Sequence, residues 1–178
     1  MTPLQLAMAF TLRPDVEGAW TPIDGGTMHG VKQSVYDAYR HSKDLSLQSV
    51  RLISDDEVNE IILSEYWRPA RCDLMPAKLA VCMFDIAYNG GPDEAIKLLQ
   101  HALGIEADGI YGAQTDATMH HTLDLETPDA PHGLVARFLD ARRAFYHNLV
   151  IKDAVKYQQY LDGWLNRVDT LEAYIKTI

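Results

Sequence analysis

The segment between Pro76 and Gly91 constrains the fold of this chain more than any other. Its apolar residues recur three and four positions apart, which is typical of a helix with one buried face. These residues are Leu79, Cys82, Met83, Ile86 and Ala87. Gly90 and Gly91 follow directly, and glycine is favoured where a helix ends. We therefore expect a central core helix over residues 76–89.

Similar patterns predict that most of the chain is helical. The other expected helices cover residues 3–13, 54–67, 92–103, 133–149 and 154–176. Pro14 should end the first of them, because proline removes an amide donor. Ser54 and Glu57 have the spacing of a capping box and should begin the second. The glycine-rich stretch 20–32 is compatible with at most a small β-hairpin, so we predict a mainly α fold.

Length and charge narrow the possible functions. The chain has 178 residues, 47% of them hydrophobic, which is enough for one domain or for two small units packed together. Its formal net charge is −9, so it lacks the basic field that gathers nucleic acid or anionic membrane surfaces. We therefore expect no nucleic-acid partner.

The sequence has no segment typical of a signal peptide or of a membrane span. The apolar stretch 4–10 has no positive charge before it and no small-residue cleavage site after it. No stretch approaches the ~20 apolar residues that a spanning helix needs. We expect synthesis in the cytoplasm and no membrane insertion.

The cysteines and histidines do not suggest a metal site. Cys72 and Cys82 are too few for a disulfide framework, and neither has a histidine at the spacing of metal ligands. His120 and His121 are adjacent, so on a helix they would point in different directions. We predict reduced thiols, with Cys82 in the core, and neither a metal nor a cofactor.

Glu17 is the residue that most directly suggests chemistry. It precedes Trp20 and the glycine-rich loop 23–30. Cleavage of a glycosidic bond needs a carboxylic acid that stays protonated near neutral pH, and an apolar neighbour such as Trp20 disfavours the charged form. The reaction also needs a second polar group to hold water or to stabilise positive charge on the sugar. Asp24 and Thr27 are the candidates.

Motifs spread over nearly the whole chain occur in a characteristic order. They are Glu17-Gly18-Ala19-Trp20, Gly25-Gly26-Thr27, Tyr66-Trp67, Cys72-Asp73-Leu74-Met75-Pro76, Phe84-Asp85-Ile86-Ala87-Tyr88-Asn89-Gly90-Gly91 and Asp108-Gly109-Ile110-Tyr111-Gly112. Together they resemble the glycoside hydrolase family 108 muramidases, a lysozyme-like group that includes phage endolysins and bacterial secretion-activator proteins. The last motif resembles the predicted peptidoglycan-binding half of these proteins. Arg142, Trp164 and Arg167 continue the resemblance toward the C-terminus.

The resemblance implies a reaction and roles for three residues. The reaction is hydrolysis of the β-1,4 bond between N-acetylmuramic acid and N-acetylglucosamine in peptidoglycan. Glu17 matches the catalytic glutamate of the family and should donate a proton to the leaving oxygen. Thr27 matches the threonine of the glycine-rich motif, and Asp24 or Thr27 would position a water. For Asp24 an ordinary tight turn is an equally good interpretation.

Several polar and aromatic residues are candidates for binding the substrate. They are Trp20, His29, Asp85, Tyr88 and Asn89. Asp85 and Asn89 lie one helical turn apart and can equally be polar residues that fix helix contacts. Glu65 falls on the apolar side of its predicted helix, where an ionised group needs a partner. For it we favour a salt bridge to Arg68 or Arg71 over a place in the cleft.

Three positions depart from the family pattern. Ala19 replaces a glycine, Pro14 interrupts the helix that leads to the glutamate, and Lys32 replaces a threonine. A lysine near Glu17 would favour the charged carboxylate and oppose its action as an acid. A non-catalytic wall-binding or secretion-assisting protein is therefore one alternative. A lytic transglycosylase, which also uses one glutamate, is another.

We expect two parts within one compact unit. Residues 1–91 would form a catalytic lysozyme-like part, and residues 92–178 a helical peptidoglycan-binding part packed against it. The protein would act as a monomer on the peptidoglycan of the cell wall, which it would reach by holin-type release or dedicated export.

Overall fold

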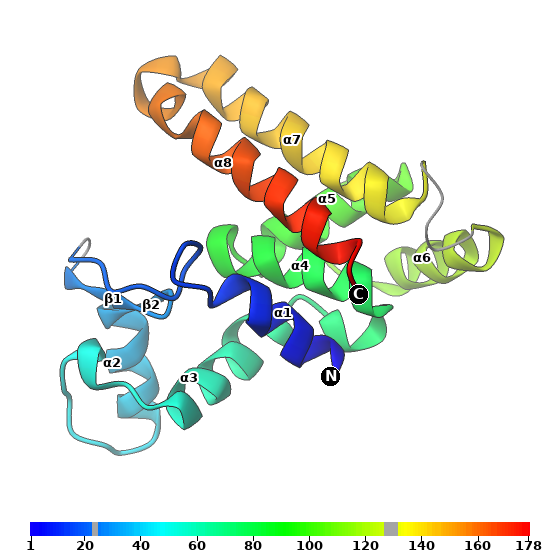
Figure 1. The fold of residues 1–178 in the computed structure, drawn as a ribbon. Coiled ribbons are helices and arrows are strands. Elements are labelled where there is room, and N and C mark those ends of the chain that lie inside the picture. The colour runs from blue at the N-terminus through cyan, green and yellow to red at the C-terminus, as the bar shows by residue number, and fades with distance from the viewer. Residues whose placement is uncertain (23–24, 127–131) are drawn as a thin grey trace.

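The computed structural model describes residues 1–22, 25–126 and 132–178, and its fold is mainly helical as predicted (Figure 1). The α-helices are α1 (Pro3–Thr11), α2 (Gln33–Ser42), α3 (Asp55–Ile61), α4 (Ala77–Gly90), α5 (Pro92–Leu103), α6 (Ala113–Leu125), α7 (Leu134–Lys152) and α8 (Ala154–Ile175). Shorter helical segments are η2 (Val50–Leu52), η3 (Ile62–Trp67) and η4 (Cys72–Leu74). Strands β1 (Thr27–Met28) and β2 (Val31–Lys32) form the small antiparallel hairpin that the glycine-rich stretch predicts.

Helix α4 is the centre of the molecule, as its apolar pattern predicts. Every residue from Leu79 to Tyr88 is buried, including residues outside the predicted stripe. The reason is that α4 contacts α1, α5, α7 and α8, so that nearly its whole circumference is covered. Figure 1 shows it between the N-terminal helix and the helices of the C-terminal half.

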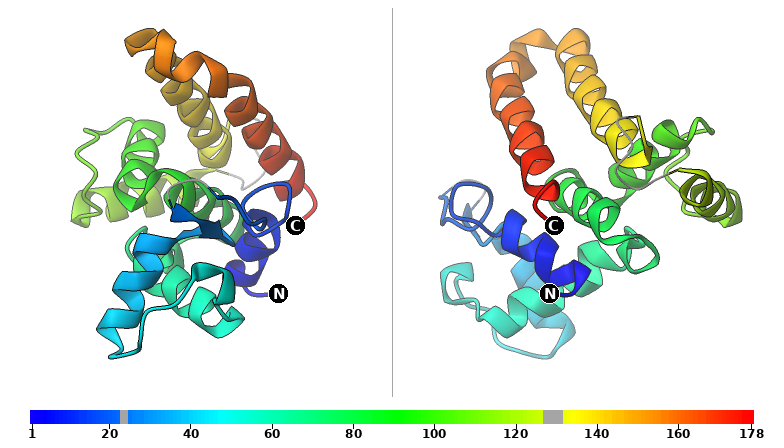
Figure 2. Two further views of the ribbon diagram at one scale, coloured as in Figure 1. Left: turned by 90° about the vertical axis from the view of Figure 1, so that its left-hand side faces the viewer. Right: turned by 45° about the vertical axis from the view of Figure 1, so that its right-hand side comes forward.

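Helices α7 and α8 form an antiparallel pair that projects from the rest of the molecule (Figures 1 and 2). Only the C-terminal end of α8 is buried, at Val168, Leu171 and Ile175. There it packs against α1, where the hydroxyl of Tyr174 donates to the carbonyl of Leu6 at 2.9 Å. The end of the chain therefore returns to its first helix.

The boundaries of several helices follow the predicted signals. Helix α1 ends at Thr11, three residues before Pro14. The capping box of Ser54 and Glu57 begins α3, with both of its hydrogen bonds formed. Helix α5 begins at Pro92 and ends at Leu103, where Gly104 adopts the left-handed conformation. These ends are set by local side chains, which is why the sequence predicts them.

The helix predicted over 54–67 is not uniform, because the α-helix stops at Ile61 and a π-helical turn, η3, continues it. A π turn has more residues per turn than an α-helix and changes which residues share a face. Glu65 is consequently exposed, not directed to the apolar side. Among the described residues it forms no ion pair, so the predicted salt bridge to Arg68 or Arg71 is wrong.

The motif around Asp108 forms a turn, as the simplest interpretation predicts. The side chain of Gln100, which is buried, accepts from the amide of Gly109 at 2.9 Å and donates to Asp108 Oδ1 at 2.7 Å. Gly109 has a φ of +80°, which favours glycine. The motif thus fixes the connection between α5 and α6.

Across residues 1–22, 25–126 and 132–178, no helix is both long and apolar enough to span a bilayer. Cys72 and Cys82 are buried free thiols, and burial raises the pKa of Cys82 to about 12.

Candidate active site

Glu17 is held close to the end of α1 by a loop that folds back on the helix. Its amide donates to the carbonyl of Thr11 at 3.1 Å, and the amide of Gly18 donates to the carbonyl of Arg13 at 2.8 Å. The turn requires glycine at position 18, because a Cβ there would lie 2.1 Å from the carbonyl oxygen of Leu12. The position of Glu17 is therefore fixed by backbone contacts.

The turn of the β-hairpin lies against Glu17 and Tyr88. Gly30 has a φ of +78°, and a Cβ at this position would lie 2.3 Å from Tyr88 Cε1 and 3.2 Å from Glu17 Cβ. The hydroxyl of Tyr88 donates to the carbonyl of His29 at 2.6 Å. His29 thus meets α4 through its backbone, and the hairpin turn is fixed beside the glutamate.

Asp85 of α4 is the centre of a buried charge cluster. Its side chain has no exposed surface. Arg142 Nη1 of α7 lies 2.7 Å from Oδ2, Arg167 Nη2 of α8 lies 2.8 Å from Oδ1, and the hydroxyl of Thr11 donates to Oδ1 at 3.1 Å. Burial opposes ionisation of Asp85, but Arg142 and then Arg167 outweigh it and hold its pKa below the ordinary value.

This burial decides between the two interpretations of Asp85. A substrate cannot touch a side chain that has no exposed surface, so the structure places Asp85 among the residues that fix helix contacts. Asn89, one turn further along α4, is exposed. Its amide donates to Glu17 Oε1 at 3.3 Å.

Arg167 connects the buried cluster to Glu17. Its Nε and Nη2 donate to Asp85, while Nη1 donates to Glu17 Oε1. Burial alone would lower the pKa of Arg167, but Asp85 and Glu17 raise it above the ordinary value. The guanidinium therefore stays charged and joins α8, α4 and the loop after α1.

The sequence analysis missed the role of Arg167 and looked for a cation at Lys32. A signal for the cluster is nevertheless present, because Leu134, Phe138, Arg142 and Tyr146 are spaced by four residues on α7. An arginine on an otherwise apolar helix face needs a buried anion, and Asp85 lies on the buried core helix. The link from this pair to Glu17 has no such local signal.

Two tyrosines form an aromatic wall beside Glu17. Tyr66 of η3 meets Tyr88 edge-on, with ring centroids 4.6 Å apart. Burial raises the pKa of Tyr88, and the neighbouring Tyr66 and Glu17 add to the shift. Burial, Glu65 and Glu17 also raise the pKa of Tyr66. Both phenols therefore stay neutral at physiological pH.

The other predicted site residues lie in or near the hairpin. The indole of Trp20 packs against Gly26, and the guanidinium of Arg51 lies 4.5 Å from its ring centroid. Thr27 pairs with Lys32 in the hairpin and exchanges two backbone hydrogen bonds with Thr21, at 2.9 and 2.8 Å. Asp24 lies outside the described residues.

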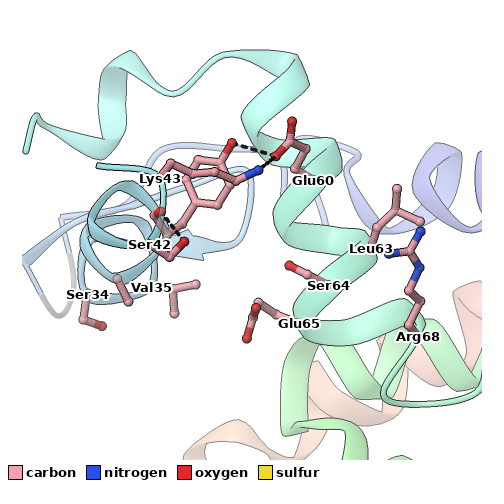
Figure 3. A pocket seen from close by; sticks show the side chains of 11 residues that line it. Ser34, Val35, Ser42, Lys43, Glu60, Leu63, Ser64, Glu65 and Arg68 are labelled. Carbon is pink, nitrogen blue, oxygen red and sulfur yellow. Dashed lines mark hydrogen bonds and ion pairs between the residues drawn. The ribbon is translucent and has the colours of Figure 1, made fainter. Parts of the chain in front are cut away.

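A cavity of about 720 Å³ lies between α2 and the α3–η3 segment (Figure 3). Tyr39 and Lys43 line one side and both donate to Glu60, at 3.1 and 2.6 Å. Glu65 lines the opposite side, next in sequence to Tyr66 of the aromatic wall. Glu17 does not line this cavity.

No group of three or more histidine, cysteine, aspartate or glutamate side chains converges as metal ligands within the part of the chain that the structure describes. Glu17, its two donors Asn89 and Arg167, and the hairpin turn make up the site. A partly exposed carboxylate held by two donors can give or take a proton and can stabilise positive charge on a ligand.

Comparison with known proteins identifies two regions. Residues 15–91 match the family model of glycosyl hydrolase 108, and residues 94–169 match that of the predicted peptidoglycan domain. No curated protein matches the sequence. Among solved structures, that of Brucella abortus SagA aligns with a TM-score of 0.72 at 22% sequence identity, over 98% of this chain and 91% of that chain. At this identity the similarity establishes a shared fold.

Proposed function

Since residues 15–91 belong to the glycosyl hydrolase 108 family and residues 94–169 to the predicted peptidoglycan domain family, we propose that this protein is an N-acetylmuramidase. It would hydrolyse the β-1,4 bond between N-acetylmuramic acid and N-acetylglucosamine. Glu17 would be the general acid. In this proposal residues 1–91 carry the catalytic carboxylate, and residues 92–178 contribute peptidoglycan binding and Arg167.

The position of Glu17 is the observation that carries the proposal. Its side chain is 24% exposed, in contrast to the fully buried Asp85. It is fixed from three sides, by the loop after α1, by the hairpin turn at Gly30 and by Asn89 and Arg167. A catalytic group that is accessible and held in one place has the geometry that proton transfer requires.

Arg167 sets a condition on the reaction. Glu17 must carry a proton to act as an acid, and both Arg167 Nη1 and the Asn89 amide donate to the same carboxyl oxygen, Oε1. Asp85 holds Nε and Nη2 of Arg167, so the arginine keeps its place when Nη1 releases Glu17. Arg167 would thus hold the carboxyl group of Glu17 in place through one contact while Asp85 fixes the arginine itself.

The chemical step follows from these positions. Glu17 would give its proton to the glycosidic oxygen as the bond from that oxygen to the anomeric carbon breaks. A water would add to the anomeric carbon and release its proton to solvent, from which Glu17 regains the proton it gave, and the sugar is left with a reducing end. We assign the positioning of this water to Thr27 or Asp24.

Mass spectrometry of purified peptidoglycan after incubation with the wild type and with Glu17→Gln tests the proposal. We expect reducing N-acetylmuramic acid ends from the wild type and a loss of at least ~100-fold in their formation with Glu17→Gln, the scale of general acid catalysis. Glu106→Gln, a change at an exposed glutamate outside the site, is the matched control and should retain activity. Products with 1,6-anhydro ends would establish a lytic transglycosylase. Sedimentation with the wall without soluble fragments would establish a binding protein.

A further inference from the structure

A second cavity, of about 360 Å³, lies on the side of Glu17 that faces the C-terminal helices. It is formed by α1, the loop that carries Glu17, the end of α4 and the middle of α8. Two of its lining residues, Asn89 and Arg167, donate to Glu17. A ligand in this cavity would therefore lie next to two residues that hold the proposed catalytic acid.

Gly163 keeps the cavity open. It lies in the middle of α8, a 22-residue helix, where glycine is less favourable than alanine. Its φ is not in the left-handed region, and a Cβ built on it meets no atom within 4 Å. Neither backbone conformation nor packing thus requires glycine here. Its effect is to leave free the space that a side chain would fill.

Polar groups around this space have hydrogen-bonding capacity that the described residues do not use. Among those residues, the side-chain amide of Asn166 and the indole N–H of Trp164 have no hydrogen-bond partner, and Oδ1 of Asn89 accepts from none. Trp164 is partly exposed and is held in place by stacking on Tyr146, with ring centroids 4.9 Å apart. Two amides and an indole thus line the opening.

We propose that this cavity is a subsite for one uncharged N-acetylhexosamine residue of the glycan strand, an inference that rests on the proposed function. The volume suits a single pyranose ring with its acetamido group. Asparagine amides can pair with the acetamido N–H and C=O, and the indole N–H of Trp164 can donate to a sugar oxygen. The cavity offers no free cation for a carboxylate of the stem peptide, because Arg167 is engaged by Asp85 and Glu17.

Calorimetric titration with tri-N-acetylchitotriose, which has no stem peptide, tests the subsite. Gly163→Phe should fill the cavity and weaken binding by roughly tenfold or more. Asp162→Phe adds the same ring at an exposed position of α8 that does not line the cavity and is the matched control, with affinity within about twofold of the wild type. Asn166→Ala, a change at an exposed side chain that leaves the helix intact, should weaken binding roughly threefold or more. Thermal unfolding of each variant checks that it is folded.

The same variants give a kinetic test on soluble peptidoglycan fragments. Gly163→Phe should raise KM by more than it lowers kcat, while Asp162→Phe leaves both close to the wild type. Chitotriose affinity that is equal in folded Gly163→Phe, Asn166→Ala and wild type would overturn the inference. So would binding of N-acetylmuramyl-L-alanyl-D-isoglutamine without binding of chitotriose, because the subsite would then recognise peptide. Neither result would bear on the catalytic role of Glu17, which the comparison of the wild type with Glu17→Gln tests separately.

Discussion

Asp85 shapes the site although no substrate can reach it. Its buried charge is compensated by Arg142 and Arg167. Arg167 also pairs with Glu17, so it links the buried cluster to the site. A buried ion pair contributes little net stability compared with an apolar replacement, but removal of one partner is costly. We therefore interpret the cluster as positioning Arg167, not as adding stability.

Asp85→Asn should therefore destabilise the protein by about 3–5 kcal/mol, because it leaves the buried Arg142 without its anion and Arg167 without one of its two. Urea unfolding at pH 7 measures this difference. Asp169→Asn is the matched control, since Asp169 pairs with Arg143 at the surface and its removal should cost no more than about 1 kcal/mol. Equal losses in the two variants would contradict the central role of the buried cluster.

The same carboxylate makes stability depend on pH. The pKa of Asp85 is lower in the folded state than its ordinary value, so its contribution is complete above the unfolded-state pKa of about 4 and is lost as the pH falls through the folded-state pKa. Urea unfolding of the wild type and Asp85→Asn between pH 7 and pH 3 tests this sign. The difference between the two proteins should shrink toward low pH. A constant difference would show that Asp85 does not titrate with unfolding.

Among the elements, the β-hairpin places its turn beside the proposed acid. Its turn depends on Gly30, where the left-handed backbone and the nearness of Tyr88 both exclude a side chain. The hairpin has only two residues in each strand, so its register depends on this turn and on Tyr88. A side chain at position 30 would displace Tyr88. The position of Glu17 is thus coupled to the hairpin through one glycine.

Gly30→Ala should reduce both stability and kcat. The left-handed backbone alone costs about 1–2 kcal/mol for a residue with a Cβ, and the 2.3 Å approach to Tyr88 adds to it. Gly104→Ala separates the two effects, because Gly104 has a φ of +72° with no atom within 4 Å of a Cβ. Unfolding and turnover of both variants should show similar backbone costs but lost turnover only in Gly30→Ala. Unchanged turnover in Gly30→Ala would show that the hairpin turn does not position Glu17.

The sequence predicts elements whose boundaries are set locally and misses those whose boundaries are not. Helix α3 begins at a capping box and α5 at a proline followed by two acidic residues, and both were predicted, whereas α2 and α6 have neither a capping box nor a first-turn proline. The π turn of η3 also leaves no sequence signature, which explains the wrong partner for Glu65. Glu17 stands out because its motif is contiguous. Arg167 does not, because it contacts Glu17 across 150 positions of the chain.

On the scale of the whole molecule, the two regions matched by different families share one core. Helix α4 lies in the first region and is covered by α5, α7 and α8 of the second. The charge cluster crosses the same boundary, since Asp85 comes from one region and both of its arginines from the other. The two regions are therefore separate as sequence families and joined as a physical structure.

Residues 1–91 alone should not form a stable folded domain. Without residues 92–178, α4 exposes the apolar surface that α5, α7 and α8 cover, and Asp85 loses both arginines. Amide proton–nitrogen NMR spectra and thermal melting of this fragment, compared with the full chain, measure the effect. We expect poorly dispersed signals and no cooperative transition. A well-dispersed spectrum with a cooperative melt would show that the first region carries its own core.

The contact between Glu17 and Arg167 also orders events during synthesis. A ribosome adds Arg167 only 150 positions after Glu17, so a growing chain contains the carboxylate long before its guanidinium partner. Asp85 likewise emerges before Arg142 and Arg167, and the buried cluster cannot close until α8 has left the exit tunnel. The arrangement of the site is thus among the last features to form, and an incompletely translated chain carries its glutamate without the geometry that holds it.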